Sequence, residues 1–239
     1  MNTRRRTFIV SALVFACVAS GGLWWSKHST FRYLSGETGE FVAQFASPPA
    51  ADSATTRTEL DELLAMQRVR TPAQVAAAQA DRKKDVSRFD AALGLDPANR
   101  PSLPALQRFT DTAEADIGPY VRAAKNRFRR LRPFEIEPQL DPCIDDVAGD
   151  QSYPSGHATY GYLMGALLSD LVPERKAELT VRAEEFARQR MVCGVHFPSD
   201  LEAGRRGAQF LAGKMRESPD FLQDESTARA ELRAALKLP

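Results

Sequence analysis

The chain has 239 residues, of which 43% are hydrophobic and 26% charged, and its formal net charge is +1 at pH 7. The length is enough for one domain with a sizeable core, and the composition is that of an ordinary globular protein. A charge so close to zero excludes a general attraction to nucleic acid or to an acidic membrane surface, so neither is an expected partner.

Residues 1–25 have the pattern of an export signal. Three arginines at residues 4–6 precede an uncharged stretch over residues 7–25 that ends in small residues and tryptophans. A basic region followed by an apolar one predicts a secretory signal, and Arg5-Arg6 resembles a twin-arginine motif. The stretch is also long enough for a single uncleaved anchor. We expect a periplasmic or secreted protein with a Sec or twin-arginine type signal, and no membrane contact beyond that alternative anchor.

Helical periodicity dominates the rest of the chain. Residues 26–56 are rich in Ser, Gly, Pro and Ala and predict a linker or irregular arm, whereas residues 57–239 predict a single helical domain. Strand signals are sparse, so the expected fold class is all-α. The expected helices cover residues 60–66, 72–93, 105–131, 155–171, 174–192, 198–217 and 220–236.

Three short segments carry the residue types that phosphoryl chemistry needs. They are Lys125-x6-Arg132-Pro133, Pro154-Ser155-Gly156-His157 and Arg190-x5-His196-x3-Asp200. Together they supply three cations, a hydroxyl on a turn, a carboxylate and two of the chain's three histidines. These groups can hold a phosphoryl group, attack it and protonate the leaving group, which predicts a phosphomonoester hydrolase.

The first segment places two cations for one anion. Seven residues of helix bring Lys125 and Arg132 to the same face, about 10 Å apart along the axis. Pro133 disfavours helical geometry at the residue before it, so Arg132 can bend towards a ligand at the helix end. Taken alone, the basic run at residues 125–132 is more typical of a solvated face or a nucleic-acid patch than of an anion site.

The second and third segments open helices. Ser155 is a good N-cap, Gly156 lets a phosphate approach the backbone, and His157 lies in the first turn. Asp200 is near enough to turn back to His196, where a carboxylate fixes the tautomer and leaves the other nitrogen as a nucleophile. Taken alone, the second segment could be an ordinary helix cap beside an incidental histidine. The third could be a capping aspartate near a buried histidine.

Two cysteines, Cys143 and Cys193, remain beyond the export signal. In an oxidising compartment the simplest expectation for such a pair is one disulfide, with two unrelated buried thiols as the alternative. A bridge would tie the loop before His196 to the segment that follows Arg132.

Together the segments resemble the signature of the type 2 phosphatidic acid phosphatase superfamily, which reads Lys-x6-Arg-Pro, Pro-Ser-Gly-His and Ser-Arg-x5-His-x3-Asp. The chain is most similar to the class A bacterial non-specific acid phosphatases, which are exported and all-helical. Residues 125–200 carry the motifs. Gln189 stands where the family has Ser, and we expect it to alter the support of Arg190 or the substrate fit.

The resemblance implies a compact helical bundle of the acid phosphatase and vanadium haloperoxidase type. It implies that His196 attacks phosphorus and becomes phosphohistidine, that Asp200 orients it, and that protonated His157 gives its proton to the leaving alcohol. The remaining site residues are expected to bind phosphate oxygens: Lys125, Arg132, Ser155, Gly156 and Arg190. Fixed cations can neutralise charge as Mg²⁺ does elsewhere, so no metal or other cofactor is expected.

The expected function is that of an exported acid phosphatase, broad in substrate, acting on small phosphate monoesters. A lipid-phosphate phosphatase of the same superfamily is one alternative, although such relatives usually span the membrane several times. A vanadium haloperoxidase and a catalytically silent phosphate-binding protein are others. The sequence leaves open whether transfer to alcohols competes with hydrolysis and whether the chain forms a homo-oligomer.

Overall fold

The computed structural model describes residues 31–144 and 151–239. Within these ranges all regular structure is helical and no strand occurs, which confirms the expected fold class. The helices are α1 (Gly39–Ala43), α2 (Ala54–Val69), α3 (Pro72–Ala80), α4 (Asp90–Leu93), α5 (Pro104–Phe128), α6 (Pro133–Ile136), α7 (Gly156–Leu171), α8 (Lys176–Val192), α9 (Pro198–Met215) and α10 (Pro219–Ala235). Single 3₁₀ turns form η1 (Val86–Phe89), η2 (Pro97–Asn99) and η3 (Pro173–Arg175). The predicted export signal lies outside the described residues.

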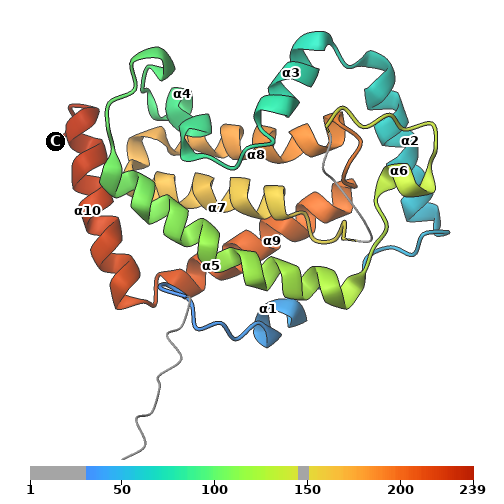
Figure 1. Cartoon of the computed structure of the whole chain (residues 1–239), viewed down its shortest axis with the longest axis horizontal. Helices are drawn as coiled ribbons and strands as arrows, with labels where there is room; N and C mark the ends of the chain where they lie inside the picture. The colour runs from blue at the N-terminus through green and yellow to red at the C-terminus, as the bar shows by residue number, and fades with distance from the viewer. Residues whose placement is uncertain (1–30, 145–150) are drawn as a thin grey trace, which may run out of the picture.

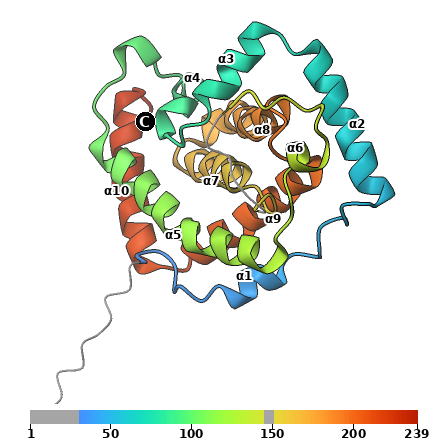
Figure 2. The same ribbon diagram turned by 45° about the vertical axis from the view of Figure 1, so that its right-hand side comes forward.

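The central helix is α7, which packs against α8 and α9. Figure 2 shows α7 nearly end-on, with α5, α8 and α9 around it. Two glycines allow these close contacts. A Cβ at Gly165 would lie 2.6 Å from Ala183 Cβ on α8, and one at Gly204 on α9 would lie 2.8 Å from Ala158 Cβ on α7. Such distances are below van der Waals contact, so the helix spacing requires glycine at both positions.

Four helix ends gather at the end of the molecule away from α10. There the C-terminal ends of α5 and α8 approach the N-terminal ends of α7 and α9 (Figure 1). The N–H of Ser155 before α7 donates to the Asp200 carbonyl oxygen of α9 at 3.0 Å. This end of the bundle therefore collects the motif segments, and it combines two helix N-termini, which favour anions.

Two predicted helices are shorter than expected. The helix predicted over residues 72–93 ends at Ala80, because the buried Asp81 carboxylate accepts hydrogen bonds from Arg88 and Arg182 and bends the chain away. The helix predicted over residues 105–131 ends at Phe128, where Arg129 adopts the left-handed conformation with φ 48°.

The expectation that Lys125 and Arg132 share one helical face is therefore wrong. Lys125 lies in the last turn of α5, whereas Arg132 is the residue before α6. The chain between them leaves the helix, because Pro133 favours extended geometry at the residue before it. Arg132 accordingly has φ −79° and ψ 158°.

Residues 31–53 are irregular apart from α1, as an arm would be, but they do not behave as a free linker. Tyr33, Phe41 and Phe45 are buried in the main core. The Asp116 carboxylate on α5 accepts the N–H groups of residues 32–34 at 2.6–3.2 Å. This part of the arm is fastened to the helical body, and the division of the chain at residue 56 stays a prediction.

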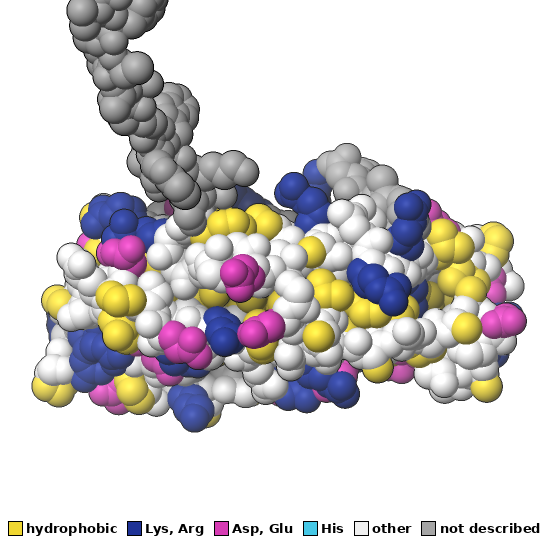
Figure 3. Space-filling model, turned by 90° about the horizontal axis from the view of Figure 1, so that it is seen from below, with side chains coloured by type: hydrophobic (Ala, Val, Ile, Leu, Met, Phe, Trp, Pro, Cys, Tyr) yellow, Lys and Arg dark blue, Asp and Glu magenta, His cyan; other side chains and the backbone are white. Residues whose placement is uncertain are grey.

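The surface carries no strongly one-sided charge on the face drawn in Figure 3, where basic and acidic side chains are interspersed with apolar ones. Across residues 31–144 and 151–239, none of the helices combines the length and the apolar character that a membrane span needs.

Candidate active site

His196 and Asp200 form a buried pair at the start of α9. Asp200 lies in the first turn, and its Oδ2 accepts the Phe197 N–H at 3.0 Å. The same oxygen lies 3.1 Å from His196 Nδ1. A carboxylate at Nδ1 places the proton of the neutral ring on that nitrogen, so Nε2 keeps a lone pair. Nε2 faces Arg132, with 3.2 Å between it and Nη1.

The surroundings set the charges of this pair. Burial lowers the pKa of His196 far below its ordinary value, and the charges of Arg132 and Lys125 act in the same direction against the hydrogen bond to Asp200. Burial alone would raise the pKa of Asp200, but the hydrogen bond to His196 and the Arg130 charge outweigh it and keep that pKa below its usual range. The pair therefore holds a carboxylate and a neutral imidazole, the state that a nucleophile requires.

Ser152 is a third member of this cluster, and sequence reasoning missed it. Its Oγ donates to Asp200 Oδ2 at 2.6 Å and lies 3.3 Å from His196 Nδ1. Its backbone N–H donates to the Arg130 carbonyl oxygen at 2.9 Å. The signal in the sequence is slight, since Ser152 lies just ahead of the turn that opens α7.

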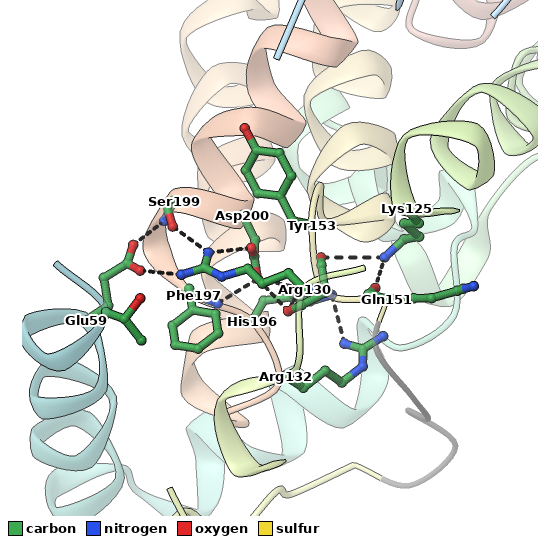
Figure 4. A network of polar contacts seen from close by, with 12 residues as sticks. Glu59, Lys125, Arg130, Arg132, Gln151, Tyr153, His196, Phe197, Ser199 and Asp200 are labelled. Atoms are coloured by element: carbon green, nitrogen blue, oxygen red, sulfur yellow. Dashed lines mark hydrogen bonds and ion pairs between the residues drawn. The ribbon is translucent and has the colours of Figure 1, made fainter. Parts of the chain in front are cut away.

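Arg130 is the second residue that sequence reasoning missed. Its Nη1 donates to Asp200 Oδ1 at 2.8 Å and to Ser199 Oγ at 2.7 Å, and its Nη2 donates to Glu59 Oε2 at 2.9 Å. The guanidinium carbon lies 3.8 Å from the centre of the Phe197 ring. Figure 4 shows Arg130 between Glu59 of α2 and Asp200 of α9.

Three cations reach the same place from separate elements: Lys125 from α5, Arg132 from the start of α6, and Arg190 from the last turn of α8. Arg132 Nη1 donates to the Val195 carbonyl oxygen at 2.9 Å, and Lys125 Nζ lies 3.5 Å from the Ser152 carbonyl oxygen. Arg190 is 1% exposed. In the described part of the chain, Arg190 Nε and Nη1 and Arg132 Nε have no hydrogen-bond partner.

These cations are crowded and poorly solvated. Burial lowers the pKa of Lys125 to about 7, with repulsion from Arg132 as the next cause. Burial lowers the pKa of Arg190 to about 9, again with Arg132 as the next cause. Buried like charges with unsatisfied N–H groups are costly, and an anion between them offsets that cost. The arrangement therefore favours an oxyanion.

The N-terminus of α7 completes this side of the site. Ser155 is the N-cap, and its Oγ accepts the Ala158 N–H at 3.3 Å. A Cβ at Gly156 would lie 3.3 Å from Val121 Cγ1 and 4.0 Å from Lys125 Cε. Gly156 thus lies close to the lysine, and its contact with phosphate stays a prediction.

His157 follows Gly156 in the first turn of α7, and its ring is held by the Arg82 carbonyl oxygen and by Phe186. Its Nε2 lies 2.8 Å from the Arg82 carbonyl oxygen, so that nitrogen carries the proton of the neutral ring. The ring stacks on Phe186, with 6.3 Å between centroids. Burial lowers the pKa of His157 well below its ordinary value, and the charge of Arg190 is the next cause.

The expected disulfide is present: Cys143 is bonded to Cys193. It fastens the segment after α6 to the turn that joins α8 to the His196 loop. Over residues 31–144 and 151–239, no group of three or more His, Cys, Asp or Glu side chains is arranged to hold a metal ion.

The comparisons with known proteins agree with this geometry. Residues 115–212 match the family model of the PAP2 superfamily. This part of the chain is a PAP2 superfamily domain. Every motif residue from Lys125 to Asp200 lies inside it.

Several acid phosphatases are similar to the chain. An acid phosphatase of Zymomonas mobilis is 36% identical over 61% of this chain and 55% of its own length, and a non-specific acid phosphatase of Salmonella typhimurium is 36% identical over 48% of each chain. The chain thus spans about half the length of these two relatives. A non-specific acid phosphatase of Providencia stuartii is 26% identical over 93% of this chain and 92% of its own. A transmembrane PAP2 type phosphatidylglycerolphosphate phosphatase from Bacillus subtilis aligns with a TM-score of 0.46 and 14% identity, over 75% of this chain and 90% of that chain.

Within the PAP2 domain, Gln189 stands beside Arg190 and is 8% exposed. Its Oε1 is buried and, among the described residues, accepts no hydrogen bond. Over the part of the chain that the structure describes, Gln189 therefore makes no hydrogen bond to the guanidinium of Arg190, whose Nε and Nη1 have no partner there.

Proposed function

We propose that this protein is an exported acid phosphatase that hydrolyses small phosphate monoesters through a phosphohistidine on His196. The observation that carries the proposal is the state of that ring: Nδ1 is held by the Asp200 carboxylate, so the lone pair lies on Nε2. Nε2 accepts from Arg132 Nη1 at 3.2 Å, a contact that a phosphoryl oxygen bound to Arg132 would replace. The similarity to non-specific acid phosphatases supports the same activity.

In the first step, His196 Nε2 attacks phosphorus as the bond from phosphorus to the leaving oxygen breaks. The ring becomes a positively charged phosphoimidazole, and the Asp200 carboxylate at Nδ1 stabilises this charge. Ser152 and the Phe197 N–H hold the carboxylate in place.

The cations bind the phosphoryl oxygens during transfer. Arg132 and Arg190 offer N–H groups that have no partner among the described residues, Lys125 adds a third positive charge, and the N-terminus of α7 adds the field of its aligned peptides. Phosphoryl transfer depends chiefly on positioning and charge neutralisation, so three fixed cations support catalysis without a metal ion.

His157 supplies the proton. A bound phosphate dianion offsets the repulsion from Arg190 and favours the protonated ring, which then donates to the leaving alcohol. In the second step the now neutral ring accepts a proton from water as the water oxygen attacks the phosphohistidine, which releases phosphate and restores His196. Charging His157 while His196 stays neutral supports work at acidic pH.

Export is supported by the basic and apolar pattern of residues 1–25 and by the bond between Cys143 and Cys193, since disulfides persist mainly in oxidising compartments.

The test is a substrate panel on the full chain. p-Nitrophenyl phosphate and nucleotides should be turned over equally well with and without chelator, and faster than phosphatidate. His196→Ala should lower kcat by about 10⁴-fold or more while tungstate still binds, and labelled substrate should leave an acid-labile phosphohistidine only on the unmodified chain. Full activity in His196→Ala, dependence on added metal, preference for phosphatidate, or bromide oxidation with vanadate would each overturn the proposal.

A further inference from the structure

Arg130 lies between two motif residues but is not part of the motif. From Arg129 to Arg132 the side chains alternate between exposed and buried, as expected of an extended segment. Arg130 and Arg132 therefore both turn inward. Arg132 reaches His196 Nε2, whereas the side chain of Arg130, within the described residues, contacts Asp200, Ser199, Glu59 and the Phe197 ring.

The two oxygens of Asp200 have separate partners. Oδ2 serves the nucleophile side, where Ser152, the Phe197 N–H and His196 Nδ1 lie within 2.6–3.1 Å. Oδ1 accepts from Arg130 Nη1 at 2.8 Å. Because a carboxylate is planar and turns about one bond, fixing Oδ1 also fixes the direction in which Oδ2 points at the imidazole.

Glu59 fixes Arg130 in turn. Its Oε2 accepts from Arg130 Nη2 at 2.9 Å, and its Oε1 accepts the Ser199 N–H at 2.7 Å. One glutamate of α2 thereby holds both the guanidinium and the first turn of α9, which carries Asp200. It also balances the guanidinium charge, so that Asp200 keeps negative charge for the imidazole.

We propose that Arg130, held by Glu59, is a positioning residue that orients the Asp200 carboxylate on His196. The inference rests on the proposed function, in which His196 is the nucleophile. It adds a link from α2 to the reacting ring, through residues at positions that the motifs leave unspecified.

The competing explanation is that Arg130 and Glu59 form an ion pair with a purely structural role. The two explanations differ in how the pH profile should respond when one of the two charges is removed. On the acid side of the kcat/KM profile, activity falls as the pair of His196 and Asp200 binds a proton. Removing the positive charge of Arg130 favours that proton, so the acid limb should move to higher pH. Removing the negative charge of Glu59 disfavours it, so the limb should move to lower pH. Loss of structure alone predicts no such opposite displacement.

Other charged groups face the pair and remain in place in both variants. They are Lys125 of α5, Arg132 at the start of α6, His157 of α7 and Arg190 of α8. Because these groups are common to all the variants, a difference in the position of the acid limb is caused by the substituted residue.

The experiment compares Arg130→Met, Arg130→Lys and Glu59→Gln on the full chain. Arg130→Met should lower kcat about 10- to 100-fold, as loss of groups that orient a functional histidine does, with KM and tungstate affinity changed less than about 3-fold. Arg130→Lys should recover part of kcat, since an ammonium can reach one carboxylate but not bridge two. Glu59→Gln should show a smaller loss of kcat, and the acid limb of its kcat/KM profile should move to lower pH.

The matched controls are Arg127→Met, an exposed arginine in the same stretch, and Glu62→Gln, an exposed glutamate of α2. Both should keep the profile of the unmodified chain. If Arg130→Met does not fold, the double variant Arg130→Met/Glu59→Leu decides, because apolar replacement of both partners commonly preserves stability. A stable double variant with full kcat would overturn the proposal, and so would single variants whose acid limbs move together or not at all.

Failure here is distinguishable from failure of the proposed function. If the unmodified chain hydrolyses phosphate monoesters and His196→Ala abolishes this, while the Arg130 and Glu59 variants behave as the controls, the positioning role alone is wrong. If the unmodified chain lacks hydrolysis, the proposed function itself is wrong.

Discussion

The two site histidines are held by opposite ring nitrogens. His196 has Nδ1 on a carboxylate and offers Nε2, whereas His157 has Nε2 on the Arg82 carbonyl oxygen. A carboxylate stabilises a ring that becomes positive during attack. The Arg82 carbonyl oxygen orients the His157 ring and raises its pKa, but burial and the Arg190 charge outweigh this effect. At the scale of single residues, this difference is consistent with the proposed roles of His196 as nucleophile and His157 as proton donor.

His157→Ala should therefore penalise substrates according to their leaving group. Alkyl phosphates need a proton on the departing oxygen, so their kcat/KM should fall about 10²- to 10⁴-fold, whereas p-nitrophenyl phosphate should lose about tenfold or less. Steady-state rates on a series of aryl and alkyl phosphates measure this, with tungstate binding as the control for folding. Equal losses across the series would contradict the acid role.

The sequence predicts the motif residues at this scale but not their support. Lys125, His157 and His196 are recognisable because their chemistry and spacing are both unusual. Ser152 and Arg130 are common residue types inside or beside a motif. Glu59 lies 71 residues from Arg130 and 140 from Ser199 along the chain. Only the packing of α2 against the start of α9 brings these groups together.

At the scale of helices, hydrophobic periodicity predicts most of the helices. It does not predict the end of a helix where a polar side chain stops it. The helix predicted over residues 72–93 breaks at Asp81, whose carboxylate binds Arg182 of α8 at 2.6 Å. That contact comes from tertiary structure and leaves no periodic signal. The spacing of α7 and α9 depends likewise on one glycine, Gly204, which reads as an unremarkable helix residue in the sequence.

Gly204→Ala tests this spacing. The new Cβ would lie 2.8 Å from Ala158 Cβ and 2.9 Å from the Ser155 carbonyl oxygen, so α7 and α9 must move apart. We expect a loss of about 1–3 kcal/mol in the free energy of unfolding. We also expect lower kcat, since the bond from the Ser155 N–H to the Asp200 carbonyl oxygen joins the same two helices.

The matched control is Gly213→Ala on the same helix, where a Cβ meets nothing within 4 Å. Alanine is the better helix former, so this variant should gain up to about 1 kcal/mol and keep full activity. Urea unfolding followed by circular dichroism measures both. If the two variants shift stability in the same direction, the close approach of α7 and α9 does not control the spacing.

At the scale of the whole molecule, the site is closed by segments that are distant in sequence. The disulfide joins Cys143 to Cys193 over a separation of 50 residues and so closes a loop of the chain that contains α7, η3 and α8. The turn that carries Cys193 is also held by other contacts. Arg70, the residue after α2, donates to the Val192 carbonyl oxygen at 3.1 Å, and Arg132 donates to the Val195 carbonyl oxygen at 2.9 Å.

These contacts predict that the disulfide acts on stability more than on catalysis. Closing a loop of this length stabilises the folded chain by about 4 kcal/mol through the entropy of the unfolded state. The double variant Cys143→Ser/Cys193→Ser should therefore unfold at clearly lower urea concentration, while the hydrogen bonds to Val192 and Val195 keep kcat within about threefold under native conditions. A reductant added during unfolding should lower the stability of the unmodified chain to that of the serine variant, and should leave the stability of the serine variant unchanged. A large loss of kcat in a variant that remains folded would instead mean that the disulfide itself positions the loop before His196.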